Sequence, residues 1–110
     1  MKVDITELLI FFDEQTPATE EERGYYWFRS KYNNSVVNLI FSLFEETCTI
    51  SLYIDGEAIT TSLRFNECIS IKILDQEKKC LEVLSSSSRC FLAMKKTLKV
   101  ECEEFSKSNS

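Results

Sequence analysis

From residue 25 to residue 103, hydrophobic and polar residues alternate with a period of two, and short polar turns interrupt the pattern. This alternation predicts β-strands that bury one face. The segments that show it are Tyr25–Tyr32, Ser35–Phe44, Thr47–Ile54, Ala58–Phe65, Cys68–Leu74, Lys79–Leu84, Arg89–Met94 and Thr97–Glu103. Because the connections are only a few residues long, we expect consecutive strands to pair as antiparallel hairpins.

Two of the connections carry specific turn chemistry. Asp55-Gly56 is the strongest hairpin signal in the chain, because a type I′ turn needs left-handed backbone at both central residues. Asn33-Asn34 predicts a second turn, since asparagine tolerates positive φ.

The N-terminal segment has a different period. Its apolar residues Ile5, Leu8, Leu9 and Phe12 recur at helical spacing, which predicts a short amphipathic helix over residues 4–14. Asp4 stands three residues before Glu7, as in a capping box. An edge strand is the alternative, because the segment is rich in isoleucine and phenylalanine.

The segment Thr16–Gly24 predicts a second, one- to two-turn helix on the surface. Threonine stands at the N-cap position, Pro17 follows it, glutamates fill the early turns and glycine comes just past the end. The segment has almost no apolar residue to bury, so a mobile acidic loop is the alternative interpretation.

These elements predict a mainly β fold of the α+β class. We expect an antiparallel meander of about eight short strands that forms a sandwich or half-barrel, with the N-terminal helix over one sheet face or one open end. The chain has 110 residues, which predicts a single domain over residues 1–105, followed by a disordered tail over residues 106–110.

Composition argues against enzyme classes. The chain has no histidine, so it lacks Ser-His-Asp triads, Cys-His dyads and histidine-ligated zinc. Its two glycines, Gly24 and Gly56, occupy turns and cannot form a phosphate-binding loop. We therefore predict no enzymatic activity, no catalytic residues, no cofactor and no metal.

The five cysteines each fall within a predicted strand and are expected to act as small buried hydrophobic residues. Their odd number argues against a disulfide framework, and no CxxC pair is present. A metal site across neighbouring strands is the alternative. The longest apolar run, Leu8–Phe12, is too short to cross a bilayer, so we expect a cytoplasmic protein without membrane contact.

The formal net charge is −5, and residues 1–55 alone carry −6. An acidic surface repels phosphate backbones and attracts cationic proteins, so nucleic acid is an unfavourable partner. The densest aromatic cluster spans Tyr25–Tyr32, where alternation sends Tyr25 and Trp27 to one face and Tyr26 and Phe28 to the other. One half of this cluster is then exposed, as in protein–protein hot spots.

The aromatic-arginine strand at Tyr26–Arg29, the hairpin that reaches Ser51–Ile54 and the strand Cys68–Ile73 resemble a family of small bacterial proteins. These are the immunity proteins of polymorphic-toxin or contact-dependent growth inhibition systems, which are often compact, acidic and β-rich. The resemblance covers roughly residues 23–103.

The resemblance implies that the chain binds the C-terminal toxin domain of a larger effector inside the producing cell. Many such toxins are nucleases with basic clefts, which an acidic patch would occupy. The implied contact residues are the acids Asp13, Glu14, Glu20, Glu21, Glu22, Glu45, Glu46 and Asp55, with an aromatic anchor among Tyr25, Tyr26 and Trp27. The competing hypothesis is a non-enzymatic β domain that binds an apolar ligand or serves as a structural subunit.

Overall fold

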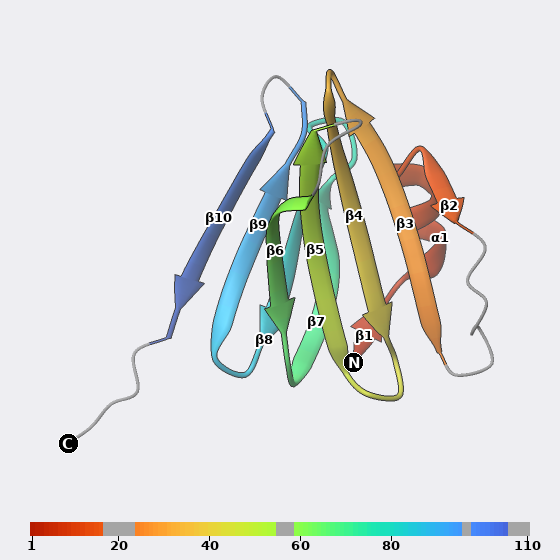
Figure 1. The fold of residues 1–110 in the computed structure, drawn as a ribbon. Helices are drawn as coiled ribbons and strands as arrows, with labels where there is room; N and C mark the ends of the chain where they lie inside the picture. Colours follow the sequence, from red (N-terminus) through yellow and green to blue (C-terminus); the bar gives the residue numbers. More distant parts are fainter. Residues whose placement is uncertain (17–23, 55–58, 96–97, 106–110) are drawn as a thin grey trace.

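The structure, a computed structural model, describes residues 1–16, 24–54, 59–95 and 98–105. Within these residues the chain forms a two-layer β-sandwich with one short helix (Figure 1). In chain order the elements are β1 (Lys2–Val3), α1 (Ile5–Phe11), β2 (Glu14–Thr16), β3 (Tyr25–Tyr32), β4 (Ser35–Ser42), β5 (Thr47–Ile54), β6 (Ile59–Phe65), β7 (Cys68–Asp75), β8 (Cys80–Ser85), β9 (Ser88–Ala93) and β10 (Lys99–Glu104).

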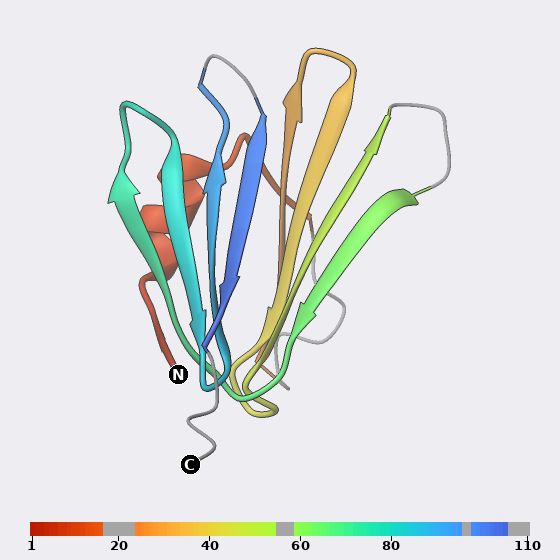
Figure 2. The same cartoon turned by 90° about the vertical axis from the view of Figure 1, so that its left-hand side faces the viewer.

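The described strands form two sheets of five. Sheet B has the order β2-β3-β4-β5-β6, and sheet A has the order β1-β7-β8-β9-β10. All neighbouring strands are antiparallel except β1, which runs parallel to β7. The chain passes from one sheet to the other between β6 and β7, where the sheets approach each other, and they diverge toward the opposite end (Figure 2).

The predicted α+β class, the sandwich and the meander are confirmed, and all eight predicted strands are present with boundaries shifted by at most two residues. Two strands were missed. The segments β1 and β2 are only two and three residues long, so no alternation is visible in them. The expectation that all strands are antiparallel is wrong for β1. No hairpin joins β1 to β7, so no short turn fixes the direction in which β1 runs beside it.

The predicted N-terminal helix is present but shorter than expected. It spans Ile5–Phe11, and the Asp4 side chain accepts a hydrogen bond from the Glu7 backbone N–H at 3.1 Å, as the cap prediction requires. After the helix the backbone turns extended at Phe12, and Glu14 begins β2. Pairing with β2 satisfies the backbone N–H and C=O groups on this edge of β3. If the helix continued instead, those groups would lack these partners.

Thr16, the N-cap of the second predicted helix, is the last residue of β2, and an N-cap residue also has extended backbone, so this residue does not test the prediction. The rest of that prediction, residues 17–23, lies outside the described residues, as do the Asp55-Gly56 turn and the predicted tail. The Asn33 turn is confirmed by its positive φ of 53°.

Helix α1 closes one side of the sandwich. It connects β1, at one edge of sheet A, with β2, at the same side of sheet B (Figure 1). Its buried residues are Leu8 and Phe11, whereas Leu9 is 48% exposed. Leu9 was expected on the buried face, but it lies about 100° from Leu8 around the helix, whereas Phe11 lies only about 60° away.

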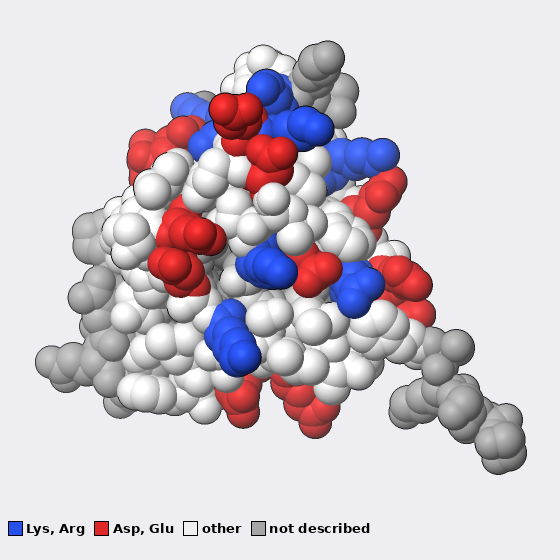
Figure 3. Space-filling model, turned by 180° about the vertical axis from the view of Figure 1, so that it is seen from behind, with Lys and Arg blue, Asp and Glu red and all other residues white. Residues whose placement is uncertain are grey.

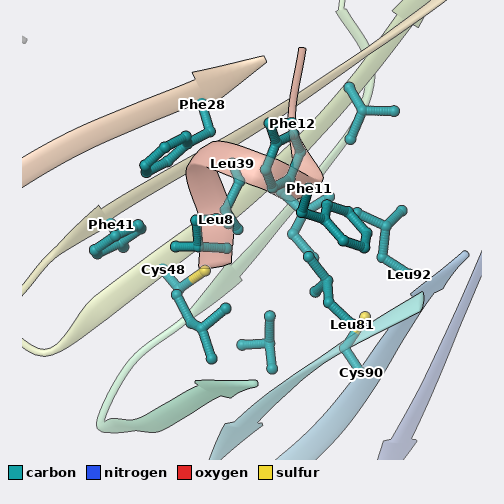
Figure 4. Close-up of a cluster of buried hydrophobic side chains, with 14 of the residues drawn as sticks. Leu8, Phe11, Phe12, Phe28, Leu39, Phe41, Cys48, Leu81, Cys90 and Leu92 are labelled. Atoms are coloured by element: carbon teal, nitrogen blue, oxygen red, sulfur yellow. The ribbon is translucent and has the colours of Figure 1, made fainter. Parts of the chain in front are cut away.

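The core lies between the sheets and extends under the helix (Figure 4). Phe28 packs against Phe12 and Phe41 with ring centroids 5.8 and 6.1 Å apart, so the helix segment and the two central strands share one aromatic group. Sheet A contributes smaller side chains to the same core. They include Ile71, Leu81, Val83, Cys90 and Leu92.

Candidate interaction surfaces

The aromatic strand β3 divides its side chains between the two faces as the alternation predicts. Tyr26 stacks on Phe41 at 5.3 Å in the core, and Phe28 is fully buried. Trp27 lies on the outer face of sheet B and is 37% exposed. Its indole Nε1 donates a hydrogen bond to Asn38 Oδ1 at 2.7 Å, which fixes the ring on the surface.

The described acidic residues of the predicted contact surface form two separate groups. Asp13 and Glu14 lie beside the middle of β3, where Glu14 is in register with Arg29. Glu45 and Glu46 lie in the β4–β5 turn near the start of β3, and Glu45 accepts a hydrogen bond from the Tyr25 hydroxyl at 2.6 Å. Tyr25 and Arg29 are four residues apart on an extended strand, about 13 Å.

The remaining predicted acids, Glu20, Glu21, Glu22 and Asp55, lie outside the described residues. On the face shown in Figure 3, acidic and basic side chains alternate in small groups, and no broad acidic area dominates that face. Among the described residues, the acidic character of the chain is therefore divided among several places.

The side of the sandwich opposite α1 has an open groove. Its lining residues come mainly from β6, the last strand of sheet B, and from β10, the last strand of sheet A. These two strands are the edges nearest the viewer in Figure 2. The groove has a volume of about 750 Å³ and is lined by Leu63, Arg64, Phe65, Ser87, Ser88, Cys102, Glu104 and Phe105. Half of this lining is apolar or sulfur-containing, and the rest is polar or charged. The sequence interpretation assigned no role to these residues.

Phe105 forms part of one wall of this groove and is held there by neighbouring residues. Its backbone N–H donates to the Ser87 carbonyl at 2.9 Å, so the residue continues the pairing at the end of β10. The Arg89 guanidinium carbon lies 5.8 Å from the ring centroid of Phe105, and Arg89 also forms an ion pair with Glu82 at 3.3 Å. The ring is 40% exposed despite these contacts.

All five cysteines are free, and four of them form two thiol pairs. Cys102 donates to Cys90 across β9 and β10 with the sulfurs 2.8 Å apart. Burial and this contact raise the pKa of the Cys90 thiol. A hydrogen bond with Cys68, together with burial, raises the pKa of Cys48, and the same bond lowers the pKa of Cys68. A metal site in a protein usually has at least three ligating side chains. Within the described residues no group of three metal-ligating side chains occurs.

Alkylation of the folded protein by iodoacetamide is expected to modify Cys102 first and Cys80 more slowly. Cys102 is exposed and Cys80 half-buried, whereas Cys48, Cys68 and Cys90 are buried, and alkylation requires an accessible thiolate. Peptide mass spectrometry over time measures the order. In urea all five cysteines should react at similar rates. Early labelling of Cys48 or Cys90 without denaturant would contradict the packing of the core.

No helix within the described part of the chain is long and apolar enough to cross a membrane.

Comparison with known proteins gives one informative relationship. No family model matches the sequence, and no curated protein matches it. Among solved structures, the chain is similar to a chain of the contact-dependent growth inhibition toxin–immunity protein complex from Klebsiella pneumoniae 342. The similarity has a TM-score of 0.78, covers 91% of this chain and 92% of the other, and has 14% sequence identity. The resemblance indicated by the sequence is thus confirmed for the fold: this chain has the fold of a component of a contact-dependent growth inhibition toxin–immunity complex.

Proposed function

We propose that this chain is an immunity protein that binds and neutralises a cognate toxin domain. The observation that carries the proposal is the structural similarity to a component of a toxin–immunity complex over nearly the whole of both chains. The sequence supports the same class independently, through the aromatic-arginine strand and the acidic charge.

The composition favours the immunity component over the toxin component. The chain has no histidine and a formal charge of −5. A toxin that cleaves nucleic acid needs groups for acid–base catalysis and a surface that attracts phosphates, whereas an inhibitor needs only a complementary surface. The alternatives, an apolar-ligand carrier and a structural subunit, have no comparable support.

The partner we infer is a toxin nuclease with a basic active-site cleft. The negative charge of this chain would raise the rate of encounter with such a cleft and disfavour nucleic acid as a competing ligand. Trp27, held on the outer face of sheet B by Asn38, is a suitable aromatic anchor for the contact. Binding would take place in the cytoplasm of the producing cell, before the toxin reaches its substrate.

Coexpression tests this function. The chain is tagged and expressed with the C-terminal domain of the protein encoded immediately upstream, which on its own should arrest growth. We expect growth to be restored and a stoichiometric complex to be purified. The Phe11→Ala variant, which should unfold more readily, serves as a control for protection that depends on folded protein.

Two outcomes would overturn the proposal. One is continued growth arrest with no complex while the chain is folded and abundant. The other is growth arrest caused by this chain alone, which would identify it as the toxin component. The toxin's activity on DNA and RNA, measured with and without the chain, then tests whether the target is a nuclease.

A further inference from the structure

The open side of the sandwich has an incomplete sheet edge. Helix α1 covers the opposite side, but within the described residues no element pairs with β10 on its outer edge. An edge strand presents unpaired N–H and C=O groups at every second residue, and such edges accept an additional strand from another chain. β10 is six residues long, enough for several ladder hydrogen bonds.

The side chains of β10 alternate between two environments. On the outer face of sheet A, Glu101 and Glu103 stand in register with Phe91 and Arg89 of β9. On the inner side, Cys102 stands in register with Cys90, and Cys102 and Glu104 line the groove. In a strand added beside β10, the side chains of one face would therefore lie next to two exposed glutamates, and those of the other face would point into the groove.

This alternation defines the chemistry of the added segment. β10 has three glutamates and one lysine, and Lys99 already pairs with Glu101 at 2.9 Å. Residues beside Glu101 and Glu103 should still be lysine or arginine, because the strand remains acidic overall and opposite charges across neighbouring strands are stabilising. Residues on the other face should be apolar, because they meet Leu63, Phe65 and Phe105. The other edge of the groove is less suitable for a basic segment, since its charged residue is Arg64.

A second copy of this chain is the competing occupant of the same edge. Antiparallel pairing of two β10 strands centred on Cys102 places Glu101 opposite Glu103 of the other copy. Centring the pair on Glu101 places that residue opposite itself, but it also places Lys99 opposite Glu103 on both sides. Like charges directly opposite are destabilising and opposite charges are stabilising, so the glutamates disfavour self-association in the first register only, whereas a cationic segment gains from them in either register.

We infer that the cognate toxin adds an extended segment to the free edge of β10, with basic side chains against Glu101 and Glu103 and an apolar side chain in the groove beside Phe105. This inference rests on the proposed function and specifies where its partner binds. It places a contact in the second half of the chain, which the sequence interpretation left without a site.

The first test locates the contact in the complex with the upstream-encoded toxin domain. Hydrogen exchange of the backbone amides in β10 should slow on binding, because their free N–H groups become paired. Labelling of Cys102 by N-ethylmaleimide, followed by peptide mass spectrometry, should slow by more than an order of magnitude, while labelling of Cys80 should change little. The isolated chain provides the reference for both measurements.

The second test uses charge reversals with equal change in net charge. The variant Glu101→Lys/Glu103→Lys should weaken binding on the order of 100-fold. The control Glu7→Lys/Glu77→Lys changes two exposed glutamates at α1 and the β7–β8 turn and should stay within about threefold of the unmodified chain. Thermal unfolding of each variant confirms that both are folded.

The outcomes separate this inference from the proposed function. A stable, protective complex in which β10 exchange and Cys102 labelling are unchanged would overturn the β10 contact and leave the immunity function in place. Equal weakening by both double variants would show that only total charge matters, which also overturns it. Failure of any complex to form would overturn both.

Discussion

Replacement of Phe11 by alanine is expected to lower the free energy of unfolding by about 3–5 kcal/mol. The Phe11 side chain is fully buried and packs edge-on against Phe12, with ring centroids 5.0 Å apart. Lys79 reaches the same place from the β7–β8 turn, where its Nζ donates to the Phe11 carbonyl at 2.8 Å. Truncation leaves a cavity in the core cluster under the helix, and the sandwich loses a large side chain that closes this side.

Urea unfolding followed by circular dichroism measures this loss, with Ile10→Ala as the matched control. Ile10 is the preceding residue on the same helix but is 64% exposed, so its truncation should change the free energy of unfolding by less than about 0.5 kcal/mol. A similar loss of stability in both variants would mean that the face of α1 that carries Leu8 and Phe11 is not the buried one.

The variant Ile50→Asp should show no cooperative unfolding transition, because it should be unfolded at room temperature. Ile50 is fully buried at the centre of β5, and its register partners Leu39 and Leu63 are apolar. An unpaired ionised carboxylate in such a place costs several kcal/mol, which is comparable with the total stability of about 5–15 kcal/mol for a small domain.

The neighbouring substitution Thr49→Asp separates burial from the effect of a charge in the strand. Thr49 faces the outer side of sheet B and stands in register with Arg64, so the new carboxylate gains a cationic neighbour. We expect its midpoint of thermal denaturation to stay close to that of the unmodified chain. A folded Ile50→Asp variant with the same midpoint would show that the two faces of β5 have been assigned the wrong way round.

The eight main strands could be predicted because each buries one face, so hydrophobic and polar residues alternate along their sequences with a period of two. The same property placed Phe28 inside and Trp27 outside. The short strands β1 and β2 could not be found this way, because pairing partners far along the chain determine them rather than local pattern. Their partners, β7 and β3, become known only when the sandwich is assembled.

The candidate site shows a similar division. Acidic residues were chosen by their clustering along the sequence, yet Glu14 and Glu45 lie near different parts of β3. The acids of β10 were passed over because the second half of the chain is nearly neutral overall. Their significance depends on β10 being the last strand of its sheet and on the groove beside it, and both are properties of the assembled fold. The strand itself was nevertheless predicted, over Thr97–Glu103, with Glu101 and Glu103 on its outward face.

The parallel pairing of β1 with β7 has a consequence for how the protein is made. Synthesis proceeds from the N-terminus, so the first residues leave the ribosome well before the strand they pair with. Sheet B from β3 to β6 contains only local hairpins and can assemble as it emerges. The segment from Met1 to Phe12, with its apolar helix face, must wait until residues 68–75 are available. During that interval the exposed leucines and phenylalanines of this segment are a natural binding site for chaperones that recognise nascent apolar chains.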